Sequence, residues 1–288
     1  MVNNDLDIKI YLMSGTANSF AITSFMSEQS ANHLHEAFNV SSLSELAKKF
    51  CSITDVDGFI IVTESKSKNN DYKWIFFNRD GSPAEMCGNA ARCIGHLTFK
   101  NHIAGQEHTF ESIAGDISVF VETEDRVTVG MTKIKNLKQN LNFKFEENSF
   151  SYTHLDTGVP HCVFKINSFD KLNDHKAMAE KLRNSLELYP TGTNVTFYSV
   201  NDSNKSIQSA SFERGVEDFT QACGTGAVAA AFCHHENSSE SLIEVNMPGG
   251  IVLVDFSKVT PYLIGPIKYN STLFPEDIKE LWTNSFTA

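Results

Sequence analysis

Two short turns, each opened by a cysteine and a glycine and followed by a helical pattern, constrain the fold of this chain most strongly. The first places Cys87 before Gly88, and the second places Cys223 before Gly224, 136 residues later (223 minus 87). Each turn follows a strand pattern of alternating or continuous apolar residues. Strand, turn, Cys-Gly and helix therefore occur twice, which predicts two similar α+β halves facing each other across a cleft.

The position of each cysteine at a helix start suggests chemistry. A helix N-terminus presents free backbone N–H groups and a partial positive charge. That field lowers the pKa of a thiol and binds a carboxylate. One cysteine before a glycine is more often a small packing residue, but Cys87 and Cys223 occupy matching places in two half-units. Together they favour a site that removes a proton from one face of a carbon and returns one to the other.

Length and charge limit the classes of function. A chain of 288 residues predicts about two domains. The formal net charge of -11 argues against non-specific binding to nucleic acid or to an anionic membrane. The first residues lack the basic and apolar runs of a secretory signal, and no apolar run approaches the ~20 residues that span a bilayer. We therefore expect a cytoplasmic protein.

Metal and nucleotide sites are not indicated. The six cysteines include no CxxC pair and are expected to be reduced, and the scattered histidines form no persuasive metal set. Gly224-Thr225-Gly226 lacks the lysine of a phosphate-binding loop.

Local patterns give a coarse secondary structure. Ser42 is predicted to cap a helix, and a second helix is predicted over residues 88–99. Asp170 is predicted to cap a helix with Met178, Leu182 and Leu186 on one face. A hairpin is expected around Pro248-Gly249-Gly250, and the polar residues 135–148 are expected to form a surface loop. The other expected strands are residues 8–12, 59–62, 74–77, 117–121, 127–131, 162–166 and 194–200.

Several polar residues near these turns are candidates for binding. His161 precedes a strand and is a candidate for tuning a thiol, although a single histidine is more often structural. Arg214 is a candidate for binding a carboxylate through its planar fork. Its neighbour Glu213 is a candidate for binding an ammonium group or biasing the second thiol. Four asparagines that follow strand or loop signals read singly as turn formers: Asn18, Asn78, Asn89 and Asn194.

These residues also form a pattern that resembles a known family. The segment Asn78-x-Asp80-Gly81-Ser82-x4-Cys87-Gly88-Asn89-Ala90-x-Arg92 is similar to the signature of diaminopimelate epimerases. Glu213-Arg214-Gly215, followed by Ala222-Cys223-Gly224-Thr225-Gly226, resembles the second site of that family. Further landmarks follow in the same order, and the resemblance extends from about Ile8 to Lys268.

The resemblance implies a fold and an activity. The expected fold is α+β, with two pseudo-symmetric domains, each a mixed barrel-like sheet around a central helix, and an active site in the cleft between them. The expected halves are residues 1–130 with 266–288, carrying Cys87, and residues 131–265, carrying Cys223. Such enzymes interconvert L,L- and meso-diaminopimelate in lysine and peptidoglycan-precursor synthesis. They use no pyridoxal phosphate, metal or other cofactor, and many are homodimers.

The resemblance also implies residue roles. Cys87 and Cys223 would be the acid/base pair, with His161 and Glu213 tuning the thiols. One thiol must start ionised and the other protonated, and the roles exchange with reaction direction. The implied contacts to the α-carboxylate, the α-ammonium and the distal end come from Asn18, Asn78, Gly88, Asn89, Asn194, Glu213, Arg214, Gly224 and Thr225.

The chain departs from the family pattern at a few places. Ser19 stands where the family usually has aspartate, Val159 stands where many members have asparagine, and residues 54–58 keep only Asp57-Gly58 of a glycine-rich segment. Residues 270–288 are an additional tail. The departures concern recognition of the distal end more than proton transfer. The alternatives are another cofactor-independent amino-acid racemase and a non-catalytic binding protein with the same fold.

Overall fold

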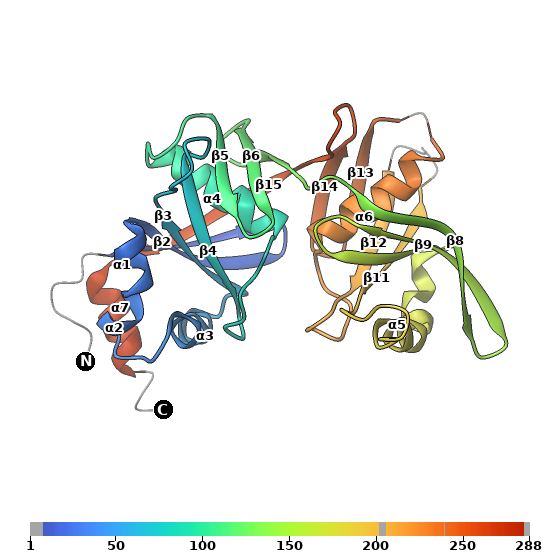
Figure 1. Ribbon diagram of the computed structural model, residues 1–288, viewed down its shortest axis with the longest axis horizontal. Helices are drawn as coiled ribbons and strands as arrows, with labels where there is room; N and C mark the ends of the chain where they lie inside the picture. Colours follow the sequence, from blue (N-terminus) through green and yellow to red (C-terminus); the bar gives the residue numbers. More distant parts are fainter. Residues whose placement is uncertain (1–7, 202–205, 239, 285–288) are drawn as a thin grey trace. The chain divides into compact units, whose positions relative to one another are not determined.

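The computed structural model describes residues 8–201, 206–238 and 240–284. The chain divides into two compact units. Unit 1 runs to Val129 and resumes at Pro266, and unit 2 runs from Gly130 to Gly265. In each unit of Figure 1, strands surround one helix, α4 in unit 1 and α6 in unit 2. The predicted α+β class with mixed, barrel-like sheets is confirmed.

Unit 1 is a closed sheet around α4. Strand β15 lies beside both β7 and β1, so the order β1 to β7 returns to its start through β15. Helix α4 packs against β1, β2 and β6. The elements are β1 (Ile10–Gly15), β2 (Asn18–Met26), α1 (Glu28–Asn32), α2 (Leu34–Ala37), α3 (Leu43–Thr54), β3 (Gly58–Thr63), β4 (Tyr72–Asn78), α4 (Gly88–Lys100), β5 (Glu107–Ser112), β6 (Gly115–Val121), β7 (Arg126–Gly130), β15 (Tyr262–Leu273) and α7 (Pro275–Asn284).

Unit 2 wraps a second sheet around α6. Its strands follow the order β8 to β14 and continue into the first residues of β15. Helix α6 packs against β10, β11, β12, β13 and β14. The elements are β8 (Lys135–Phe145), β9 (Asn148–Asp156), β10 (Pro160–Lys165), the 3-10 helix η1 (Phe169–His175), α5 (Lys176–Arg183), β11 (Asn194–Val200), β12 (Ser206–Phe212), α6 (Gly224–His235), β13 (Leu242–Met247) and β14 (Gly250–Asp255).

The two units repeat one sequence of strand directions. From β1 to β6 the successive pairs are antiparallel, parallel, antiparallel, parallel and antiparallel. From β9 to β14 the pairs follow the same order. A parallel pair needs a crossover connection. In both units the second crossover contains the central helix, so α4 follows β4 and α6 follows β12.

Some local predictions are correct and others are wrong. Ser42 caps α3 by accepting a hydrogen bond from Glu45 N, and the hairpin of β13 and β14 forms as expected. Residues 135–148 are not a loop: β8 pairs with β9, and its side chains are largely exposed, so the pattern lacked an apolar face. The helix near residue 170 is also different. Ser168 caps η1, and Leu186 lies beyond α5 and is exposed.

The C-terminal tail contributes to the core of unit 1. Ile278 and Trp282 of α7 are buried in the cluster that contains the apolar face of α3. The Trp282 ring lies 4.8 Å from that of Phe38 and 5.3 Å from that of Phe50. In the described part of the chain, no helix has both the length and the apolar character needed to cross a membrane.

Candidate active site

Cys87 is the N-cap residue of α4 in unit 1. Its backbone is extended, with φ -147° and ψ 118°, and its side chain is partly exposed. A tight turn leads from β4 to this position: Asn78 N donates to Ser82 O at 2.8 Å, and Gly81 has φ 83°. The turn places Cys87 directly before the N–H groups of Gly88 and Asn89, which the first turn of a helix leaves without helical partners.

A buried polar network lies beneath that helix start. The Asn89 Nδ2 group donates to Asn18 Oδ1 at 2.5 Å, which joins α4 to the first residue of β2. The Arg92 Nη2 group donates to Asn89 Oδ1 and to Thr16 Oγ1, each at 2.7 Å. Gly15 allows this approach, because a Cβ there would lie 2.8 Å from Asn89 O. The side-chain amide of Asn89 is thereby held on both its oxygen and its nitrogen.

Cys223 occupies the equivalent place in unit 2, as the N-cap of α6 with φ -121° and ψ 105°. It is buried, and its surroundings are acidic. Burial, followed by the nearby Glu213 carboxylate, raises the pKa of the Cys223 thiol. Glu213 accepts hydrogen bonds from Thr220 Oγ1 and from Cys223, while burial raises its own pKa. A lowered thiol pKa, expected from the helix start alone, is therefore wrong for Cys223, because desolvation outweighs the helix dipole.

His161 connects to Cys223 through a hydroxyl. Its Nε2 lies 3.0 Å from Thr225 Oγ1, which lies 3.5 Å from Cys223 Sγ. Its Nδ1 lies 2.8 Å from Thr196 Oγ1. The ring is fully buried, and burial lowers the pKa of His161 to about 3. The imidazole is therefore neutral near neutral pH, and Thr225 links it to the thiol.

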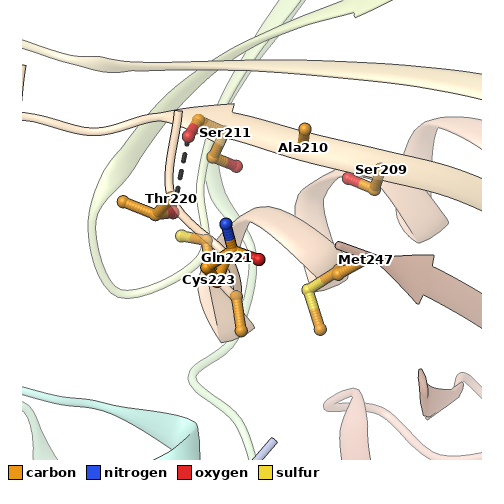
Figure 2. A pocket seen from close by; sticks show the side chains of 8 residues that line it. Ser209, Ala210, Ser211, Thr220, Gln221, Cys223 and Met247 are labelled. Atoms are coloured by element: carbon orange, nitrogen blue, oxygen red, sulfur yellow. Dashed lines mark hydrogen bonds between the residues drawn. The ribbon is translucent and has the colours of Figure 1, made fainter. Parts of the chain in front are cut away.

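The helix start in unit 2 requires a glycine and borders a small hollow. A Cβ at Gly226 would lie 2.1 Å from Ser211 Oγ and 3.2 Å from Cys223 Sγ. Figure 2 shows Ser211, Thr220 and Met247 around Cys223, where they help to line a shallow hollow. Thr220 Oγ1 also donates to Ser211 O at 3.4 Å, the interaction drawn as a dashed line.

Asn194 and Arg214 lie together at the edge of unit 2. The Arg214 N–H donates to Asn194 Oδ1 at 2.9 Å, and its Nη1 donates to Thr191 O at 2.5 Å. Asn194 begins β11 and is buried, whereas Arg214 is exposed and follows β12. The arginine thus has a fixed backbone and a side chain that is accessible to an anion.

The structure places the predicted residues in two groups, one in each unit. Unit 1 contains Asn18, Asn78, Cys87, Gly88 and Asn89, of which Asn18 and Asn89 are hydrogen-bonded and Asn78 is exposed. Unit 2 contains His161, Asn194, Glu213, Arg214, Cys223, Gly224 and Thr225. Within the described residues, no group of three or more histidine, cysteine or acidic side chains is arranged to hold a metal ion.

Sequence reasoning did not select four polar neighbours of these groups. Thr196, Ser211 and Thr220 complete the surroundings of Cys223 and His161, and Arg92 organises Asn89. Arg92 belongs to the signature segment and was available as a signal. Thr196 and Ser211 alternate with apolar residues like ordinary strand residues, and Thr220 lies in the loop before Cys223, so nothing in the sequence distinguishes them.

Comparison with known proteins agrees with this arrangement. The family model described as diaminopimelate epimerase matches residues 11–137 and 153–270. The diaminopimelate epimerase of Aquifex aeolicus (strain VF5) is 33% identical over 259 residues, which cover 87% of this chain and 91% of that protein. The enzyme of the same name from Hydrogenobaculum sp. (strain Y04AAS1) is 32% identical over 232 residues, covering 78% and 83%. This chain belongs to the diaminopimelate epimerase family.

Family membership makes the chain an enzyme of the isomerase class, with a small-molecule substrate. Solved structures of low identity support the fold. A probable proline racemase from Agrobacterium radiobacter K84 matches with a TM-score of 0.68 at 10% identity, covering 92% of each chain. A PhzF-family phenazine biosynthesis protein from Bacillus anthracis matches with a TM-score of 0.67 at 12% identity, covering 93% of this chain and 98% of its own.

Proposed function

We propose that this enzyme interconverts L,L- and meso-diaminopimelate with Cys87 and Cys223 as its acid/base pair and without a cofactor. The observation that carries the proposal is the repeated position of the thiols. Each is the N-cap of the helix that follows the fourth strand of its repeat, α4 after β4 and α6 after β12. We further propose that residues 1–130 with 266–288 form one epimerase half, that residues 131–265 form the other, and that the active site lies in the cleft between them.

The helix starts supply the electrostatics of the proposed reaction. The α-hydrogen of an amino acid is a very weak acid, so the developing carbanion must be stabilised. The N–H groups of Gly88, Asn89, Gly224 and Thr225 would bind the α-carboxylate. Preorganised N–H donors in a water-excluded site stabilise charge that develops on this carboxylate in the transition state.

The proton balance requires only the two thiols. One cysteine, as the thiolate, takes the α-proton from one face, and the other, as the thiol, donates its proton to the opposite face. The product leaves the first cysteine protonated and the second ionised, so the reverse reaction uses the same pair. Glu213 contacts Cys223 and Thr220, and His161 reaches the thiol through Thr225. These contacts support their proposed role in tuning Cys223, and Glu213 would also bind the α-ammonium group.

The distal end of the substrate would be bound by Asn18, Asn78, Asn194 and Arg214. The exposed guanidinium of Arg214, anchored through its backbone to Asn194, is suited to a carboxylate. A second candidate is a racemase for another amino acid. Ser19 favours it, because the family usually has an acidic side chain at this position and this chain has a hydroxyl. The Ser19 N–H donates to Asp57 Oδ2 at 2.9 Å. Val159 favours it as well, because an apolar side chain stands where many members bind substrate.

The test is incubation with L,L-diaminopimelate in D2O, followed by NMR of the α-hydrogen and chiral analysis. Meso product carrying solvent deuterium is expected. Exchange without a requirement for the distal carboxylate and ammonium would instead favour the second candidate. Exchange with neither diaminopimelate nor other amino acids would favour a binding protein. Cys93→Ala is the matched control, because Cys93 lies on the same helix as Cys87 and is fully buried.

We also propose that the enzyme is a cytoplasmic homodimer. A cytoplasm that keeps thiols reduced suits a reaction that needs two cysteines in the free form. All six cysteines lie in the described residues, and none is in a disulfide. Light scattering coupled to size exclusion tests the dimer, and a monomer at assay concentration would contradict it. Fractionation of the source cells tests the location.

A further inference from the structure

Arg92 is a buried charge in an otherwise neutral environment. Its side chain is fully buried in α4. Among the described residues its hydrogen-bond acceptors are two side-chain oxygens, of Thr16 and Asn89, and two carbonyls, of Gly88 and Pro266, the latter two at 3.4 Å. None of the ion pairs in the described part of the chain includes Arg92. A buried cation without an acidic partner is costly, so a nearby anion would stabilise it.

The position of Arg92 identifies that anion. Arg92 lies five residues after the N-cap Cys87, and its Nη1 group reaches back to Gly88 O in the first turn. A cation near a helix N-terminus is disfavoured by the helix dipole. Burial lowers the pKa of Arg92 to about 10, which keeps it charged near neutral pH, and the charges that act in the opposite direction are those of Cys93 and Cys87.

The other titratable groups around α4 do not supply the anion. Cys93 is fully buried, and burial raises the pKa of its thiol to about 12. Glu85 precedes Cys87 and is exposed. The strands that pack against α4 contribute Tyr11 of β1 and Asp116 of β6, and Asp116 is exposed and bound by Asn70 Nδ2 at 2.8 Å. Strand β2 contributes no ionisable side chain. Of these groups, Cys87 is therefore the one whose negative charge can act on Arg92.

We propose that Arg92 is a positioning residue that makes Cys87 the resting thiolate of the free enzyme and that fixes Asn89 and Asn18 for substrate. The inference rests on the proposed function. The guanidinium acts on Cys87 by its charge and on Asn89 by its geometry, since Asn89 Oδ1 accepts from Arg92 while Asn89 Nδ2 donates to Asn18. These two actions are separable, because lysine keeps the charge and lacks the planar fork.

The first experiment measures alkylation of each thiol in the unmodified enzyme. Iodoacetamide is applied across a range of pH without substrate, and peptide mass spectrometry gives the rate at Cys87 and at Cys223. Only the thiolate reacts, so the pH at half-maximal rate reports its ionisation, while burial of the thiol changes the maximal rate. We expect a lower midpoint for Cys87 than for Cys223. An equal or higher midpoint for Cys87 would overturn the proposal.

The second experiment compares Arg92→Gln with Arg92→Lys. In Arg92→Gln we expect the Cys87 midpoint to rise by about one pH unit, with about tenfold slower alkylation near neutral pH. The Cys223 midpoint and the thermal transition serve as folding checks, and Arg126→Gln, at an exposed arginine of the same unit, is the control. An unchanged Cys87 midpoint in folded Arg92→Gln would overturn the proposal.

Arg92→Lys separates charge from geometry. We expect it to keep the Cys87 midpoint while raising KM, because the ammonium cannot hold Asn89 in the same way. A midpoint raised as far as in Arg92→Gln would contradict a role for the charge. Alkylation needs no substrate, so these results are independent of the D2O assay. Shifted midpoints without epimerisation would refute the proposed substrate. Epimerisation with unshifted midpoints would refute the role of Arg92.

Discussion

The N-terminus of α4 in unit 1 and that of α6 in unit 2 share a backbone arrangement but differ in the charges beside it. Each is capped by a cysteine with extended backbone, after a loop closed by one isolated bridge, Phe77 with Pro83 or Phe212 with Phe219. The side chains around the caps are opposite in charge. The partly exposed Cys87 interacts electrostatically with the buried Arg92, whereas the buried Cys223 contacts an acidic side chain and lies near a neutral histidine.

This difference shows how a repeated backbone can serve a reaction in which the two cysteines must always be in different protonation states. Inversion by two thiols needs one thiolate and one thiol in the resting enzyme. Two identical environments would give both cysteines the same ionisation. Environments that separate the pKa values of two titratable groups determine in advance which group is the base and which is the acid. The common backbone would then bind the substrate carboxylate, and the differing side chains would set the direction of proton transfer.

The largest expected effect comes from replacing either of the two capping cysteines. We expect Cys87→Ser and Cys223→Ser each to lower epimerisation at least about a thousandfold, because a serine hydroxyl is a far weaker acid than a thiol and is not ionised near neutral pH, so it can neither donate nor take the proton effectively. The measurement is the rate of meso product formation. The matched controls are Cys93→Ala on α4 and Cys233→Ala on α6, which remove buried thiols away from the helix starts. Normal turnover in either serine variant would refute the two-thiol mechanism.

Glu213→Gln tests the acidic side of the comparison. Glu213 raises the pKa of Cys223, so its neutral isostere is expected to lower the alkylation midpoint of Cys223, opposite in sign to the effect of Arg92→Gln on Cys87. Turnover should fall about a hundredfold, because the resting thiol is less well maintained and the α-ammonium contact is lost. Thr220 can still donate to the amide oxygen, so folding should be preserved. A Cys223 midpoint that stays or rises would remove Glu213 from this role.

The sequence predicted the repeated features well and the differences between the repeats poorly. Strand β11 follows from its apolar residues, the alanine-rich segment indicates α6, and the Cys-Gly turns located the starts of both central helices. Strand β8 was missed because its side chains are mostly exposed, so pairing with β9 rather than an apolar pattern defines it. The helix start alone suggested a lowered pKa for Cys223, whereas burial raises it; desolvation depends on packing by Ser211, Gly226 and the neighbouring strands, which no local pattern reports.

Thr225→Val should have a smaller effect on turnover. It removes the hydroxyl that joins His161 Nε2 to Cys223 Sγ and retains the shape of the side chain. We expect about a tenfold loss, in line with one neutral hydrogen bond of about 1 kcal/mol together with an unsatisfied buried imidazole nitrogen. Thr225→Ser restores the hydroxyl and should recover most of the activity. If Thr225→Ser is impaired as much as Thr225→Val, the hydroxyl alone does not account for the loss.

The smallest expected effect is on the pH dependence of stability, which His161 should change in unit 2 and not in unit 1. His161 is neutral in the folded state with a pKa of about 3, below the ordinary value of about 6.5, so between these values the unfolded chain binds more protons. The neutral His161 therefore leaves the free energy of unfolding unaffected above about pH 6.5. As the pH falls toward 3, the free energy of unfolding decreases by at most about 1.4 kcal/mol per pH unit.

His161→Gln should reduce this dependence in unit 2. Both tryptophans, Trp74 and Trp282, lie in unit 1, so fluorescence reports on the wrong unit. Hydrogen exchange of the paired strands β10 and β11, which carry His161 and Thr196, measures the relevant opening. The unmodified protein should lose protection there on acidification, and His161→Gln should lose less, whereas the control His33→Gln, at an exposed position of unit 1, should follow the unmodified protein. Identical slopes in all three proteins would mean that folding does not keep His161 neutral in this pH range, and a cation beside Cys223 would then reduce the difference in charge between the two helix starts.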